Sequence, residues 1–121
     1  MPPRDPVAWL EDIRAAIAAI GDAVAGIDLE LYCSTRQIRS SVEREFMVIG
    51  EALRQLLDAE PMLAERFTAA RDIISFRNHL AHGYFAISNE TVWGIIEGHL
   101  PILQAEIEAL WIERTGEESS Q

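Results

Sequence analysis

The chain has 121 residues, a length typical of a single domain, and 49% of them are hydrophobic, which is enough to build a core. All ten basic residues are arginines, so chemistry that needs a lysine amine is excluded, and Cys33, the single cysteine, excludes an intrachain disulfide. The formal charge of −10 is opposite to the basic surplus typical of nucleic-acid-binding proteins, and it favours a basic protein partner.

Apolar residues recur at helical spacing through most of the chain, which predicts an all-α protein. The first helix is expected to have Asp5 as its N-cap and Pro6 at its first position, with an apolar stripe that reaches Val24. A second stripe predicts a helix over about residues 34–58. Gly50 lies in the middle of that helix, where it costs helix propensity, so we expect it to mark a close approach between helices.

Three further helical segments follow. Pro61 opens a short one over 61–67, and another is expected over 69–81, where Gly83 provides a natural end. The last helix begins at Ser88 or Asn89 and carries a stripe to residue 110. Pro101 should either kink this helix or divide it into two segments.

These elements predict one up-and-down bundle of four to five helices over residues 1–114, followed by a disordered acidic tail over 115–121. The amino-terminal residues lack the apolar core of a signal peptide, and no stretch is long and apolar enough to span a membrane. We therefore expect a cytoplasmic protein without membrane contact.

Residues 77–84, at a predicted helix end, contain several polar side chains that can bind or protonate a phosphate group. This set contains no carboxylate or thiol, so it is poor in metal ligands but rich in groups that bind and protonate phosphates. For RNA cleavage by the 2′-hydroxyl, His82 could act as base or acid and Arg77 could neutralise the phosphate oxygens. Asn78 could orient the phosphate or the imidazole. The segment therefore indicates metal-free phosphoryl chemistry.

Arg77 and His82 are five residues apart, which on an α-helix separates their directions by about 140° and their heights by about 7.5 Å. A single chain should therefore offer only part of a site. Two chains packed about a twofold axis could bring both copies of each residue into one cleft, with one imidazole as base and the other as acid. This geometry predicts a functional homodimer.

The spacing of Arg77, His82 and Tyr84 resembles the signature of the HEPN superfamily, and more closely that of the HepT-like toxins: an arginine, four residues, a histidine, one residue and a tyrosine. Segments 43–52, 73–76, 92–93 and 100–101 are also similar to this family. The resemblance covers roughly residues 5 to 112.

The resemblance implies a metal-independent endoribonuclease, the toxin of a type VII-like HEPN/MNT toxin–antitoxin system, with the motif at a homodimer cleft and no cofactor. It also implies an MntA-like minimal nucleotidyltransferase antitoxin that transfers adenylate to Tyr84. An adenylylated tyrosine would fill the cleft and place negative charge where RNA phosphate must bind.

Two further residues are candidates for supporting roles. Glu51 interrupts an apolar stripe, and a partly buried carboxylate needs a partner, for which an arginine or histidine of the motif segment is a candidate. His79 is more simply an ordinary structural histidine. Its spacing from His82 would also allow a shared metal ion, with His99 or Cys33 as a further ligand.

Two other functions remain open. The acidic charge favours a non-catalytic helical binding partner of a minimal nucleotidyltransferase. The third candidate function is that of a helical bundle that binds a nucleotide or another small phosphate through Arg77.

Overall fold

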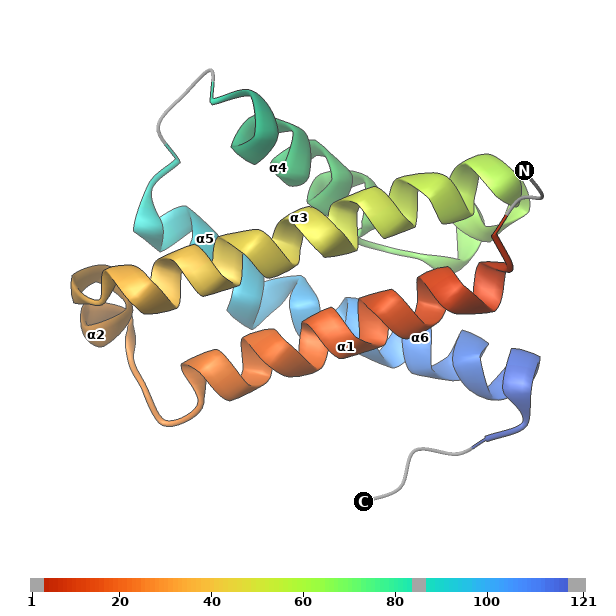
Figure 1. The fold of residues 1–121 in the computed structure, drawn as a ribbon, viewed down its shortest axis with the longest axis horizontal. Helices are drawn as coiled ribbons and strands as arrows, with labels where there is room; N and C mark the ends of the chain where they lie inside the picture. Colours follow the sequence, from red (N-terminus) through yellow and green to blue (C-terminus); the bar gives the residue numbers. More distant parts are fainter. Residues whose placement is uncertain (1–3, 84–86, 118–121) are drawn as a thin grey trace.

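The computed structural model describes residues 4–83 and 87–117, and this part of the chain contains six α-helices, one 3-10 helix and no strand (Figure 1). The elements in chain order are α1 (Pro6–Val24), α2 (Leu29–Ser34), α3 (Arg36–Ala59), the 3-10 helix η1 (Pro61–Arg66), α4 (Ala70–His82), α5 (Asn89–Gly98) and α6 (Leu100–Thr115). The all-α prediction is confirmed.

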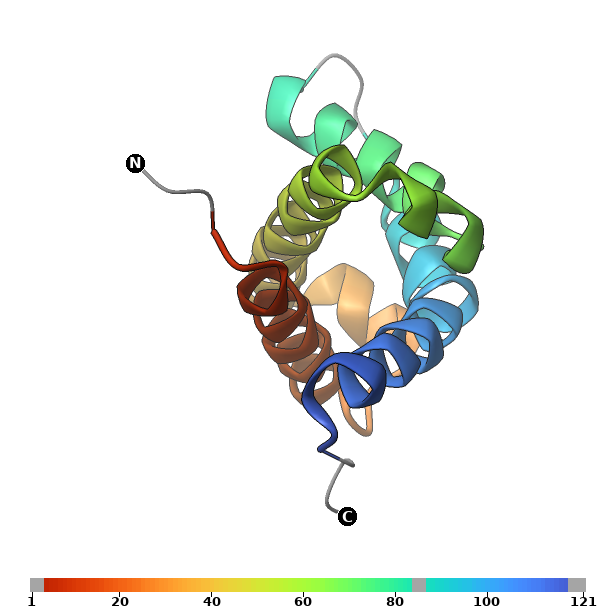
Figure 2. The ribbon, with the colours of Figure 1, turned by 90° about the vertical axis from the view of Figure 1, so that its right-hand side faces the viewer.

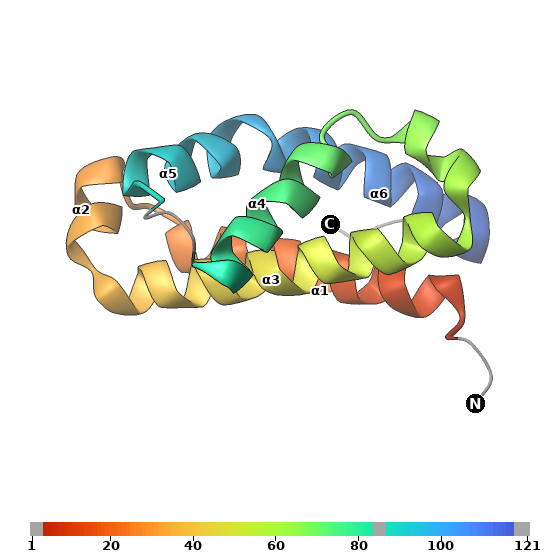
Figure 3. The same ribbon diagram turned by 90° about the horizontal axis from the view of Figure 1, so that it is seen from above.

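The long helices alternate in direction around a common core. α1 and α3 lie side by side and run in opposite directions, while α4 crosses over α3 (Figures 1 and 3). The end-on view shows α5 and α6 on the opposite side of the bundle from α1 and α3 (Figure 2). The predicted up-and-down bundle is therefore confirmed.

The amino-terminal signals of α1 are as expected from the sequence. The carboxylate of Asp5 accepts a hydrogen bond of 2.9 Å from the backbone N–H of Val7, and Pro6 occupies the first helical position. The predicted apolar stripe is buried in the core from Leu10 to Ile20, and its end residues Val7 and Val24 are partly buried against the core.

The short helix α2 is absent from the sequence prediction. It has six residues, too few to show a helical period, and Asp28 caps it by accepting a hydrogen bond of 2.9 Å from the N–H of Leu31. Its Tyr32 is fully buried, and the rings of Tyr32 and Trp93 lie 5.3 Å apart, which ties α2 to α5.

The last predicted helix is divided into two. α5 begins after the N-cap Ser88, whose hydroxyl accepts from the N–H of Thr91, and it ends at Gly98. α6 then starts at Leu100 with Pro101 in its first turn, where a missing N–H costs no hydrogen bond. Of the two expected outcomes at Pro101, the structure shows the abutting segments.

The carboxyl end of α6 passes the expected domain boundary by one residue. Thr115 belongs to the helix and its hydroxyl donates to the carbonyl of Trp111, while Gly116 closes the helix with a positive φ of 73°. Residues 118–121 of the expected tail lie outside the described residues. None of the helices described combines the length and the apolar character needed to cross a membrane.

Candidate functional site

α4 crosses α3 at Gly50, and this crossing positions Arg77. A Cβ atom added to Gly50 would lie 2.3 Å from the Cβ of Arg77 and 2.6 Å from its Cγ, far inside van der Waals contact. Gly50 therefore leaves room for the aliphatic stem of Arg77. The close helix–helix approach predicted at Gly50 is confirmed, and it occurs at a proposed catalytic residue.

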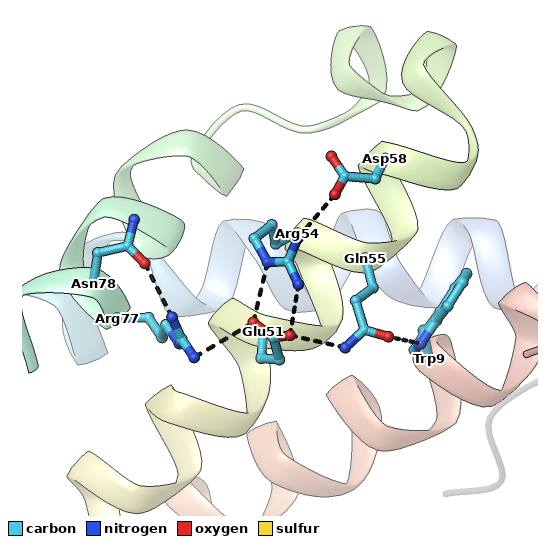
Figure 4. Close-up of polar contacts among 7 residues, drawn as sticks. All are labelled: Trp9, Glu51, Arg54, Gln55, Asp58, Arg77 and Asn78. Carbon is cyan, nitrogen blue, oxygen red and sulfur yellow. Dashed lines mark hydrogen bonds and ion pairs between the residues drawn. The ribbon is translucent and has the colours of Figure 1, made fainter. Parts of the chain in front are cut away.

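The side chain of Arg77 is 25% exposed, and its guanidinium is incompletely partnered (Figure 4). Its Nη1 donates a hydrogen bond of 3.1 Å to Oδ1 of Asn78, and its Nη2 lies 3.4 Å from Oε1 of Glu51. Its Nε is buried without a hydrogen-bond partner. The two terminal nitrogens are therefore the part of this cation that an anionic ligand can reach.

Glu51 contacts Arg77, as expected, but its main partners are on its own helix (Figure 4). Arg54 donates to both carboxylate oxygens, at 3.1 and 2.7 Å, and Gln55 donates to Oε2 at 2.9 Å. Hydrogen bonds from Arg54 and Gln55, with a smaller contribution from the charge of Arg77, lower the pKa of Glu51 to about 2. Glu51 is ionised at neutral pH, and that pKa makes it a poor general base.

The polar contacts continue from α3 to α1. The indole Nε1 of Trp9 donates a hydrogen bond of 2.8 Å to Oε1 of Gln55, so an unbroken series of contacts joins Trp9 to Asn78 (Figure 4). An open pocket of about 360 Å³ lies along this series. Its lining consists of Arg4, Trp9, Asp12, Met47, Val48, Glu51, Ala52, Gln55 and Arg77.

The sequence analysis missed Arg54, Gln55 and Trp9. The i, i+3 and i, i+4 spacings of Arg54 and Gln55 from Glu51 were visible signals of contact on one helix. Nothing in the sequence indicated Trp9, which is 46 residues from Gln55 and reaches it only because α1 packs on α3.

The two motif histidines occupy different places on α4. His82 is exposed, is the last residue of the helix, and precedes Gly83, whose φ of 63° forms the C-cap. His79 is also exposed, and it lines a separate pocket of about 240 Å³ with Asp72, Ser75 and residues of α5. His82 lines neither this pocket nor the one at Arg77. The joint action of Arg77 and His82 from two chains therefore stays a prediction.

Tyr84, the expected adenylylation site, lies outside the described residues. Within residues 4–83 and 87–117, no three His, Cys, Asp or Glu side chains gather in a way that could hold a metal ion. Nε2 of His99 lies 3.5 Å from Oδ2 of Asp72. The metal site considered for His79 and His82 therefore gains no support.

The fold and the motif residues together define an α-helical bundle of the HEPN type. The model of the family described as "Ribonuclease HepT-like" matches residues 13–110. The chain belongs to this HepT-like family.

Proteins similar to this chain carry ribonuclease names. "Putative RNase MJ1380" of Methanocaldococcus jannaschii is 29% identical over 110 residues, which cover 89% of this chain and 98% of that protein. "Probable ribonuclease HepT" of Thermococcus cleftensis is 26% identical over 102 residues, covering 84% of this chain and 92% of that protein. No solved structure matches the chain.

Proposed function

We propose that this protein is a metal-independent endoribonuclease and the toxin of a HEPN/MNT toxin–antitoxin system. Membership of the HepT-like family supports the reaction class. The observation that carries the proposal is the incompletely neutralised guanidinium of Arg77, with the exposed imidazole of His82 five residues further along the same helix. An arginine of this kind suits a phosphodiester because its terminal nitrogens match two phosphate oxygens.

In the proposed reaction, the terminal nitrogens of Arg77 hold the two non-bridging oxygens of the scissile phosphate. One His82 takes the proton of the 2′-hydroxyl, whose oxygen then attacks phosphorus. The 5′-oxygen leaves and takes a proton from a second His82, which yields a 2′,3′-cyclic phosphate and a 5′-hydroxyl. Asn78, already hydrogen-bonded to Arg77, orients the guanidinium or the phosphate.

This chemistry needs a homodimer. Each chain carries one His82, so a single chain cannot supply the pair of imidazoles that this reaction uses. A twofold axis near the end of α4 would place two copies of both residues around one phosphodiester. Sedimentation should therefore give twice the chain mass, and a variant that remains monomeric should be inactive.

The proposed partner is a minimal nucleotidyltransferase antitoxin that adenylylates Tyr84. Incubation with that partner and ATP should increase the intact mass by adenylate units, and Tyr84→Phe should abolish the increase. An unchanged wild-type mass would contradict the modification.

The decisive experiment measures RNA cleavage in EDTA by the wild type and by two histidine variants. We expect His82→Ala to fold normally and to lose activity by a factor of about 10²–10⁴, the usual contribution of a general acid or base. His79→Ala is the matched control, because His79 is on the same helix but lines a different pocket. Cleavage that stops in EDTA, or survives in His82→Ala, would overturn the mechanism.

A second candidate is a non-catalytic binding partner of the nucleotidyltransferase. The formal charge of −10 favours it, because an acidic surface suits a basic protein better than RNA. Tight binding to the nucleotidyltransferase by a wild type that cleaves no RNA would favour this candidate over the first.

A further inference from the structure

Glu51 is the carboxylate closest to the guanidinium of Arg77, yet its oxygens are occupied by other donors. Oε1 accepts from Nε of Arg54 at 3.1 Å, and Oε2 accepts from Nη2 of Arg54 at 2.7 Å and from Gln55 at 2.9 Å. Arg77 approaches Oε1 only to 3.4 Å, an ion-pair contact that adds no hydrogen bond. The carboxylate is therefore held toward Arg54.

The two arginines of this cluster are neutralised to different degrees. Arg54 bonds both Glu51 and Asp58, whose Oδ2 lies 2.9 Å from its Nη1. Arg77 has the longer contact to Glu51, a neutral amide oxygen from Asn78, and a buried Nε without a partner. The positive charge that remains for a ligand is therefore concentrated on Arg77.

The restraint on Glu51 comes from two sides. Arg54 holds it from one turn further along α3, and Gln55 holds it while being held itself by the indole of Trp9 on α1. A carboxylate without these donors would be able to form short bidentate bonds to Arg77, which is the geometry that arginine and carboxylate prefer. Those bonds would use the same nitrogens that a phosphate needs.

We propose that Arg54 and Gln55 restrain Glu51, so that Glu51 aligns the guanidinium of Arg77 without closing onto it and leaves Arg77 available for an RNA phosphate. The ligand in this inference rests on the proposed ribonuclease function. Arg54 is a positioning residue that acts through Glu51, and Glu51 competes with substrate when Arg54 is lost.

Restraint of Glu51 by Arg54 predicts that a second substitution restores the KM for RNA, which would not happen if Arg54 had a merely structural role. In Arg54→Ala, the freed Glu51 closes onto Arg77, and the KM for RNA should rise about three- to five-fold, as expected for a partly exposed ion pair, with kcat little changed. The double variant Arg54→Ala/Glu51→Gln removes the competing charge and should return KM to near the wild-type value.

Arg66→Ala is the matched control. Arg66 is also an exposed arginine in an ion pair, but its partner is Glu113, so the variant loses one positive charge and one surface pair that includes neither Glu51 nor Arg77. Its KM should stay at the wild-type value. A rise in KM equal to that of Arg54→Ala, or a double variant no better than Arg54→Ala alone, would overturn the proposal.

A measurement without RNA separates this inference from the proposed function. In protein labelled with ¹⁵N-arginine, the Nε–H signal that disappears in Arg77→Lys belongs to Arg77, and rotation about its Nε–Cζ bond slows when a carboxylate holds the guanidinium. We expect slower rotation in Arg54→Ala than in the wild type, and faster rotation in Arg54→Ala/Glu51→Gln. An unchanged Arg77 signal would refute the restraint, whereas a wild type that neither binds nor cleaves RNA would refute only the proposed function.

Discussion

The contact between Gly50 and Arg77 can be tested with one methyl group. Gly50→Ala places a Cβ at 2.3 Å from the Cβ of Arg77, so α3 and α4 must move apart, because no change of rotamer moves the Cβ of Arg77. Overpacking of this kind costs about 1–3 kcal/mol, which outweighs the gain in helix propensity of about 1 kcal/mol. We expect a lower free energy of unfolding in urea and a large loss of RNA cleavage.

Gly94→Ala is the control for that change. Gly94 is also inside a helix, α5, but a Cβ added there meets nothing within 4 Å. The propensity gain should therefore appear without a penalty, as a stabilisation of up to about 1 kcal/mol. If both alanine variants were equally stable, the missing side chain of Gly50 would not be what makes room for Arg77.

Glu51 makes the stability of the fold depend on pH in a defined window. Its folded-state pKa of about 2 is below the ordinary value of 4.5, chiefly because Arg54 and Gln55 donate to the ionised form. The stabilisation is therefore complete above pH 4.5 and is lost as the pH falls toward 2. The stability difference between wild type and Glu51→Gln, from urea unfolding, should be present at neutral pH and shrink across this window. A difference that stayed constant with pH would contradict the assignment.

At the scale of elements, an aromatic pair holds α4 against α3. Phe46 and Phe76 pack edge to face with ring centroids 5.1 Å apart, and they are 0% and 7% exposed. Phe76→Ala should cost about 3–5 kcal/mol in urea unfolding, because it removes a buried ring and leaves a cavity. Met62→Ala, at a side chain that is 85% exposed, should be close to neutral. A small loss for Phe76→Ala would show that α4 is held by other contacts.

The helices that the sequence predicted well are those with long apolar stripes. On α3, Val42, Phe46, Ile49, Leu53 and Leu56 are all fully buried, as their spacing required. The six-residue α2 was not predicted because six residues are too few to show a helical period. Its sequence signal was limited to the N-cap residue Asp28. Segment 61–67 was expected to be helical, and the structure there is a 3-10 helix over Pro61–Arg66.

The site was only partly predictable for a different reason. Gly50 and Glu51 each broke the apolar pattern of α3, so the sequence could single them out. The restraint by Gln55 and Trp9 depends on the packing of α1 against α3, which no local pattern encodes. Arg77 and His82 are five residues apart on α4, which is about 140° in direction on an ideal helix, so their cooperation remains a prediction about two chains.

At the scale of the whole molecule, the charge of −10 limits how RNA can bind. Contact should be centred on the two Arg77 copies of the proposed dimer, since the net negative charge of each chain repels phosphate. Because both Arg77 copies hold the one scissile phosphate, a single phosphate contact on a single strand gives a slope of log affinity against log salt of roughly −0.7. Anisotropy of a labelled 2′-deoxy oligonucleotide across a salt series would measure it. A slope several times steeper would indicate a broad basic surface and contradict this localised contact.

The hydrogen bond from Trp9 to Gln55 makes the region around Arg77 accessible to optical measurement. The indole emission of Trp9 responds to the polarity and charge beside it, and Trp9 lines the same pocket as Arg77. A chain with Trp93→Phe and Trp111→Phe would retain Trp9 as its sole indole fluorophore. Ligand occupancy could then be followed in real time without attaching a dye.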